Sequence, residues 1–326
     1  MLPGESLLFH TMVQLTVAIS GTLIACLLAL LYLTRVRLER PAIGTFNGRD
    51  IAVLFIFIVG LPLLYLVLPL LPLLIFLGVT LASALSIGLR PLLGPSGTWL
   101  AVGLLIGGNI WLTQTMLGTV AGWQIWWLVN SAMIIAAAVT VANLYVQGGM
   151  RVQHIAWFAV VLAVYDATFT FVWPVTNLLA QRFIGWPFDP AIGFRLGVFN
   201  YSLGLGDLLV YAMFVIGVHK AYGRAATRIA LVVVLAFGAV MPAIAPLFSS
   251  IFIDARTDLV VPAQVAFGPA AFLCYLWLKR RYGPERTMGQ FLAVTAAVRP
   301  NPARAVARHA AASTAPPRRH RASLVE

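Results

Sequence analysis

The sequence predicts an all-α, polytopic membrane protein with nine transmembrane helices. Hydrophobic residues make up 61% of the 326 positions and charged residues only 10%, and the mean hydropathy is +0.92. A soluble domain carries roughly a quarter charged residues. Apolar runs of bilayer-spanning length recur along this chain, so we expect an integral, multi-pass protein.

Prolines and polar segments divide the apolar sequence into spans. The longest run, Ile51 to Leu89, would form a helix roughly 58 Å long, about twice the hydrocarbon thickness of a bilayer. Pro69 and Pro72 are therefore expected to turn the chain between two spans. The nine expected spans cover residues 7–33, 51–69, 70–89, 98–117, 123–146, 153–175, 194–218, 229–251 and 259–278.

A short glycine-rich segment precedes the fourth span. Gly94-Pro95-Ser96-Gly97 matches the Gly-x-Ser-Gly pattern of rhomboid serine proteases. A proline and serine between two glycines are also typical of a turn, which is the interpretation we favour. The segment is thus expected to separate two membrane helices.

The basic residues predict the orientation of the chain. The net charge is +12, and the basic residues lie between the spans and in the tail, as in proteins with cytoplasmic Lys and Arg loops. This distribution indicates contact with the lipid bilayer and argues against nucleic acid as a partner. With the N-terminus outside, the basic loop residues expected in the cytoplasm are Arg35, Arg37, Arg40, Arg49, Arg90, Arg151, Lys220, Arg224 and Arg228, against Arg182, Arg195 and Arg256 outside.

Two regions follow from this arrangement. Residues 1–281 are expected to form the membrane domain. Residues 282–326 are rich in alanine, proline and arginine, so we expect a basic, disordered cytoplasmic tail.

Two carboxylates are buried within the expected spans. Of the ten acidic residues, only Asp166 in span 153–175 and Asp207 in span 194–218 lie deep in an apolar segment. A charged group in a membrane is costly and marks a functional site by default. Counted from the cytoplasmic ends, the two residues lie at depths of roughly 22 and 20 Å. Consecutive spans are antiparallel, so these carboxylates are expected to meet at one level.

Such a pair is suited to acid–base chemistry. Two carboxyl groups that share a site do not both ionise readily, so one keeps its proton. The ionised group can take a proton from water while the other donates one to a peptide carbonyl. The same residues could instead form a polar contact between helices, or the proton relay of a proton-coupled carrier.

Three motifs in this order resemble those of presenilins and signal peptide peptidases, which are intramembrane aspartyl proteases of the Gly-x-Gly-Asp type. They are Tyr165-Asp166, the segment from Leu203 to Asp207, and Pro262-Ala263-Gln264, which departs from the family's Pro-Ala-Leu at its last residue. The family's nine spans, with aspartates on the sixth and seventh, match the expected arrangement. The resemblance implies catalytic roles for Asp166 and Asp207 and supporting or substrate-binding roles for Tyr165, Gly204, Leu205, Gly206, Pro262, Ala263 and Gln264.

The resemblance also implies a function. It predicts hydrolysis of peptide bonds within transmembrane-helix substrates, including membrane proteins and signal peptides, without a metal or other cofactor. A leucine at position 264 would restore the family pattern and is expected to preserve or increase cleavage. The short loops favour a minimal form in a prokaryotic plasma membrane. The alternatives are a carrier that uses the same aspartates and a catalytically silent family member that binds membrane helices.

Overall fold

The computed structural model describes residues 3–38, 48–173, 178, 182–183, 185–196, 199–245 and 262–298. It consists of two compact units, residues 1–285 and residues 286–326, which we describe separately. The expected span ends at positions 175, 251 and 259, and the tail beyond residue 298, lie outside the described residues.

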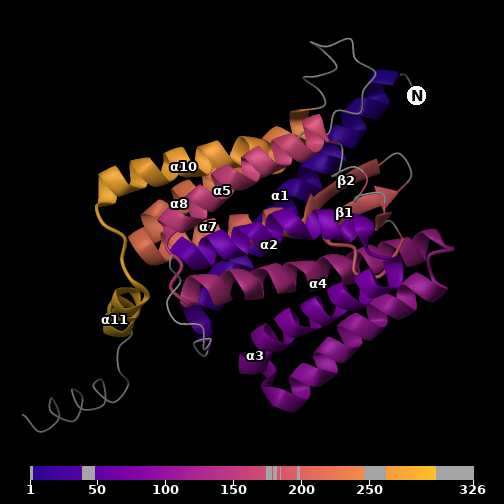
Figure 1. The fold of residues 1–326 in the computed structure, drawn as a ribbon, viewed down its shortest axis with the longest axis horizontal. Coiled ribbons are helices and arrows are strands. Elements are labelled where there is room, and N and C mark those ends of the chain that lie inside the picture. The colour runs from indigo at the N-terminus through magenta and orange to yellow at the C-terminus, as the bar shows by residue number, and fades with distance from the viewer. Residues whose placement is uncertain are drawn as a thin grey trace, which may run out of the picture. The chain divides into compact units, whose positions relative to one another are not determined.

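The first unit is built from helices, with one small hairpin. Within the described residues, six segments are long and apolar enough to cross a membrane: 11–35, 70–115, 120–147, 152–172, 205–222 and 224–245. The predicted all-α class is confirmed, and these segments support a multi-pass membrane protein. The elements are α1 (Pro3–Arg35), α2 (Gly48–Val67), α3 (Leu70–Thr115), α4 (Val120–Gln147), α5 (Val152–Ala167), the π-helical η1 (Thr168–Val172), β1 (Ala191–Leu196), β2 (Phe199–Gly204), α7 (Leu205–Tyr222), α8 (Arg224–Val233), the π-helical η2 (Val234–Val240) and α10 (Ala263–Tyr282) (Figure 1).

The two expected turns within the first half of the chain are present. Leu68 and Pro69 separate α2 from α3, as the prolines predict. Within α3, Gly94 has φ 68° and ψ 178°, a left-handed backbone that glycine adopts without a Cβ clash. At this residue α3 folds back on itself (Figure 1). The expected spans 70–89 and 98–117 are therefore the two limbs of α3.

The core of the first unit is α7. Every residue from Val210 to Val218 is buried, and α7 contacts α1, α4, α5, α8 and α10. A helix that is apolar all round is stable when neighbours cover each of its faces. The chain's central helix is therefore the one that carries Asp207.

The expected helix over 194–218 is shorter than predicted. Residues 191–196 and 199–204 instead form an antiparallel hairpin, with Ala191 opposite Gly204, and α7 begins only at Leu205. Glycine is a poor helix former, and Gly193, Gly197 and Gly204 punctuate this segment. Gly193 also has φ 129°, which a helix does not allow.

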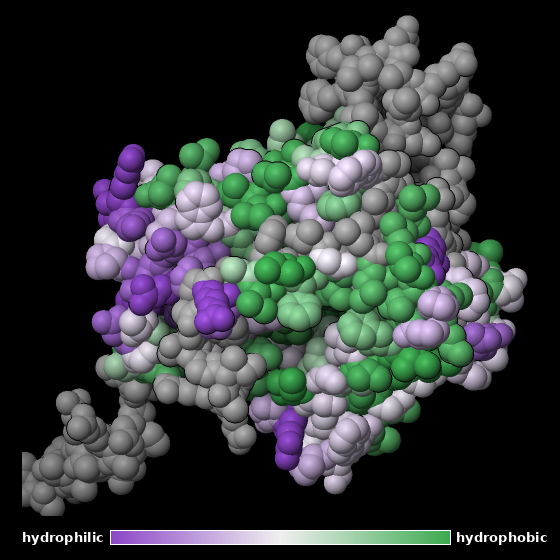
Figure 2. Space-filling model, viewed as in Figure 1, coloured by the Kyte–Doolittle hydropathy of each residue, from purple (hydrophilic) through white to green (hydrophobic). Residues whose placement is uncertain are grey.

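Apolar and basic residues are separated on the surface. The exposed residues of α3 include Ile75, Val79, Leu100 and Leu104, as expected for a helix that faces lipid. Figure 2 shows apolar side chains over much of the visible face and hydrophilic ones gathered near the end of α10. The exposed basic residues at this end of the helices are Arg151, Arg224, Arg228, Lys279, Arg280 and Arg281.

The second unit contains a helix, α11 (Met288–Val298). Its N-terminus is held by a reciprocal capping box, in which Thr287 N donates to Gln290 Oε1 at 2.8 Å and Gln290 N donates to Thr287 Oγ1 at 3.3 Å. Such a box satisfies N–H groups that a helix start leaves unpaired. Residues 288–298, within the segment expected to be disordered, thus form a helix.

Candidate active site

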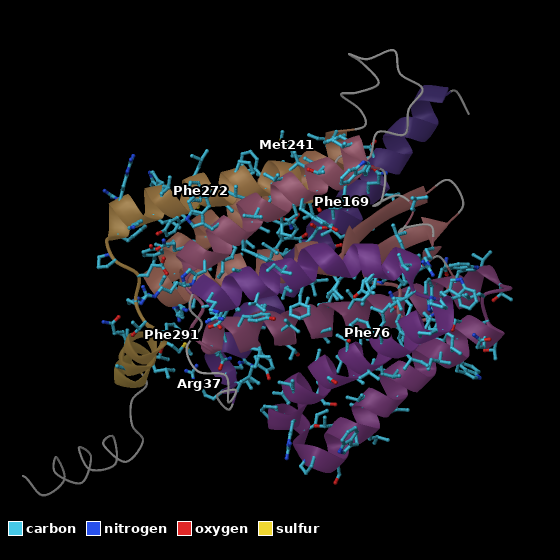
Figure 3. All side chains as sticks on the ribbon, in the orientation of Figure 1. Arg37, Phe76, Phe169, Met241, Phe272 and Phe291 are labelled. Carbon is cyan, nitrogen blue, oxygen red and sulfur yellow. The ribbon has the colours of Figure 1, made fainter. Side chains whose placement is uncertain are left out.

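Three helices bring the site together. The ends of α7 and α10 lie at the start of α5, because Lys220 Nζ donates to Met150 O at 2.5 Å and Glu285 Oε2 accepts from Val152 N at 2.8 Å. Helices α7 and α10 thus run opposite to α5. This places Asp166 near the other end of α5, at the level where α7 and α10 begin. In Figure 3, Phe169 lies just past this end of α5, and Phe272 lies further along α10.

Small residues set the spacing of these helices. A Cβ atom at Gly268 of α10 would overlap the carbonyl oxygen of Ala159 and lie 2.8 Å from Ala163 Cβ, both on α5. A Cβ at Gly217 of α7 would lie 2.8 Å from Ile155 Cδ1 of α5. Glycines at such crossings allow membrane helices to approach closely. Ala163 and Gly268 lie about one helical turn from Asp166 and Gln264, respectively.

Asp207 lies in the first turn of α7. Its Oδ2 atom accepts a hydrogen bond from Gly204 N at 3.3 Å, and Gly204 is the residue that caps the helix. A Cβ at Gly204 would lie 3.3 Å from this oxygen, so glycine leaves room for the carboxylate to fold back onto the backbone. A carboxylate near a helix N-terminus is also stabilised by the helix dipole.

The second oxygen of Asp207 is bound from α10. Gln264 Nε2 donates to Asp207 Oδ1 at 2.9 Å. Pro262 caps α10, which places Gln264 in the first helical turn, and the side chain is only 2% exposed. The residue that departs from the family pattern thus contacts one of the two aspartates directly.

Asp166, the other aspartate, lies near the end of α5. Asp166 lies 14 residues after Val152, the first residue of α5, and Asp207 lies 13 residues before Lys220 near the end of α7, so these antiparallel helices carry the two carboxyl groups at about the same level. Among the described residues, Asp166 has no hydrogen-bond partner, whereas Asp207 accepts two hydrogen bonds. The two aspartates therefore have different surroundings, which is what an acid–base pair requires.

The structure also locates the other residues that the resemblance singled out. Tyr165 packs its ring against Phe169, with centroids 4.4 Å apart. Leu205 N donates to Pro190 O at 2.8 Å, which joins α7 to the base of the hairpin. Gly206 is exposed, and a Cβ added there would meet no atom within 4 Å, so its backbone is open to close approach. Pro262 and Ala263 begin α10.

Two buried asparagines support the hairpin, and sequence reasoning missed them. Asn130 Nδ2 on α4 donates to Asp189 O at 2.9 Å and Ala191 O at 3.1 Å. Its Oδ1 accepts from Asn109 Nδ2 on α3 at 3.1 Å, and Asn109 Oδ1 accepts from Phe188 N at 3.0 Å. Since β2 runs directly into α7, this network positions the start of α7. The available signal was a polar amide within each of two apolar spans.

Aromatic side chains pack beneath the carboxylates. The ring of Phe267 on α10 contacts those of Tyr211 and Phe214 on α7, with centroids 4.7 and 5.7 Å apart. Tyr211 Oη donates to Gly238 O in η2 at 2.9 Å. These contacts join α7 to α10 and to η2, beginning one helical turn after Asp207 along α7.

Comparisons with known proteins leave the family open. No protein-family model matches the chain, and no curated protein is significantly similar to it. Within the described residues, no three histidine, cysteine or carboxylate side chains gather as metal ligands would. The geometry itself defines a class of site, namely two membrane-embedded aspartates on antiparallel helices.

Proposed function

We propose that this protein is an intramembrane aspartyl protease that hydrolyses peptide bonds within transmembrane-helix substrates. The observation that carries the proposal is that Asp166 on α5 and Asp207 on α7 lie at about the same level of two antiparallel helices, in different surroundings. The ordered motifs resembling presenilins and signal peptide peptidases point to the same reaction. Nine spans, with α5 and α7 as the sixth and seventh, belong to this proposal.

The surroundings suggest a role for each aspartate. Asp207 accepts hydrogen bonds at both oxygens, as an ionised carboxylate does, so we assign it as the base. It removes a proton from water while the oxygen attacks the scissile carbonyl carbon. Asp166 donates its proton to the carbonyl oxygen. The tetrahedral intermediate then collapses, with the proton on Asp207 transferred to the leaving nitrogen and the hydroxyl proton returned to Asp166.

The open backbone at Gly206 supports a peptide substrate. A helical peptide hides its carbonyl groups in its own hydrogen bonds, so it must unwind locally before hydrolysis. An exposed glycine beside the base allows the unwound backbone to approach without a side chain in the way. A polar contact that served only to join two helices would not require this access.

The test is cleavage of a labelled transmembrane peptide by the purified protein. Asp166→Asn and Asp207→Asn should each reduce the rate by roughly 10²- to 10⁴-fold, with normal expression and folding. Asp50→Asn, in the first turn of α2, controls for the loss of a carboxylate and should cleave normally. Cleavage at the wild-type rate by either active-site variant would exclude the dyad. Proton-driven solute flux in vesicles without peptide cleavage would favour the carrier.

We also propose an external N-terminus and a cytoplasmic C-terminus, as in signal peptide peptidases. The basic residues around the starts of α5 and α8 and the end of α10 support a cytoplasmic location for this end. A substrate strand binds a groove with one polarity, so we expect preference for substrates with a cytoplasmic N-terminus. Both native cysteines are buried, so Glu5→Cys and Ser323→Cys can be labelled on intact cells with an impermeant thiol reagent. Labelling at position 323 but not at position 5 would show the opposite orientation, with a cytoplasmic N-terminus and an external C-terminus.

A further inference from the structure

Gln264 is an unusual residue for the place it occupies. It lies in the first turn of α10, is 2% exposed, and comes just before the apolar segment that packs on α5 and α7. Its Nε2 atom is bound to Asp207 Oδ1, but its Oε1 atom is buried without a partner among the described residues. A leucine would fill similar space without leaving an acceptor unpaired. Packing alone therefore does not account for a glutamine here.

The contact with Asp207 does account for it. The Asp207 carboxylate is held from two sides, at Oδ2 by Gly204 N of its own helix and at Oδ1 by Gln264 of α10. The Gly204 bond is long, at 3.3 Å, and the Gln264 bond is the shorter of the two, at 2.9 Å. Without the amide, the carboxylate could rotate about its side-chain bonds with only the longer bond to oppose it.

We propose that Gln264 is a positioning residue, which fixes the orientation of the Asp207 carboxylate toward Asp166 and stabilises its ionised form through the Nε2 donor. This inference rests on the proposed protease function for its catalytic consequence. It reverses the expectation from the family pattern that leucine at position 264 preserves or increases cleavage. Gln264 acts through Asp207 and takes no proton itself.

Two substitutions separate positioning from packing. In Gln264→Leu the donor is lost while the volume is kept, so kcat should fall by about 10- to 100-fold, with KM changed by less than about threefold. The acid limb of the activity profile should move to higher pH, because the ionised base has lost a hydrogen bond. Asp166, whose carboxyl group feels the charge of Asp207 from the neighbouring helix, is unchanged in this variant.

Gln264→Glu tests the donor itself. A protonated glutamic acid can still donate to Asp207, whereas an ionised one repels it. This variant should therefore cleave best at low pH and lose activity as the pH rises, so the alkaline limb moves to lower pH. A residue that only filled space would not produce opposite pH shifts in the Leu and Glu variants.

The matched control is Gln153→Leu, at an exposed position on α5, which should leave the rate and pH profile unchanged. A second readout does not require activity: the Asp207 carboxylate infrared band, identified by subtracting the spectrum of Asp207→Asn, should shift in Gln264→Leu and not in the control. If wild type and Asp166→Asn cleave equally, the proposed protease function fails. The infrared band then tests by itself whether Gln264 positions the Asp207 carboxylate. A wild-type kcat and pH profile in Gln264→Leu, or an unshifted band, would overturn the positioning role.

Discussion

The close crossing of α10 over α5 provides a sharp test of how the site is held. We consider Gly268→Ala, which adds one methyl group. That methyl would lie 2.8 Å from Ala163 Cβ and overlap the carbonyl oxygen of Ala159, whereas ordinary contacts between carbon atoms are about 3.5–4.0 Å. The two helices must therefore separate locally by roughly 0.7–1.2 Å. The added atom meets backbone as well as a short side chain, so neither can rotate away.

This displacement has two measurable effects. Overpacking of a tight contact costs about 1–3 kcal/mol, which corresponds to a fall in melting temperature of roughly 2–10 °C. Gln264 lies about one turn before Gly268 on the same helix, so a shift of α10 would also disturb the 2.9 Å contact that Gln264 makes with Asp207 on α7. A misplacement of about 1 Å can reduce the rate by about 10²-fold. We therefore expect a larger relative loss of cleavage than of folded protein.

The assay compares thermal unfolding in detergent with cleavage of a labelled transmembrane peptide at a temperature where both proteins are folded. Gly103→Ala is the matched control, because Gly103 is also in a membrane helix but has no atom within 4 Å of the position of an added Cβ. It should keep both its melting temperature and its rate. A Gly268→Ala variant with the wild-type melting temperature would refute the packing argument. A variant with a lower melting temperature and an unchanged cleavage rate would show that this helix crossing does not determine the geometry of the site.

Two further predictions concern groups that hold the helix ends. Asn130→Ala removes the side chain that donates to Asp189 O and Ala191 O in a fully buried position, so the free energy of unfolding should fall by about 2–4 kcal/mol. Amide hydrogen exchange should rise first in the hairpin, and an equal rise throughout the protein would contradict this prediction. Glu285→Ala removes the acceptors for the N–H groups of Val152 and Gln153, and thermal unfolding should show a loss of about 1–2 kcal/mol of stability. Glu285→Gln keeps one acceptor oxygen and should lose less stability. Equal losses in the two variants would show that the charge of Glu285, and not its capping hydrogen bonds, stabilises the helix.

The features that could be predicted from the sequence depend on regular geometry. The rise of a helix is constant, so counting from Arg151 and Lys220 was enough to expect Asp166 and Asp207 at one level. The antiparallel orientation of α5 and α7 agrees with that expectation. The break at Pro69 followed equally from a local rule, because proline and the residue before it disfavour a continuous helix.

The features that could not be predicted depend on tertiary contacts or on ambiguous patterns. The apolar segment before Gly204 suits a buried strand as well as a helix, and periodicity does not separate the two. The contact of Gln264 with Asp207 joins residues 57 positions apart, on two helices whose packing against each other no local pattern predicts. The helix α11 is different, because its Thr287 and Gln290 capping pair is a local helix-start signal in the sequence, and it competes with an overall composition that favours disorder.

The central position of α7 has a consequence for biogenesis. α1, α4 and α5 all contact α7, yet they leave the ribosome before it is made. Until α7 inserts, these earlier helices must keep their inner faces against lipid or against insertion factors, and Asn130 lacks the hairpin that it will bind. A chain that stops before Leu205 would therefore lack not only Asp207 but also the helix around which the others assemble, and quality control should remove it.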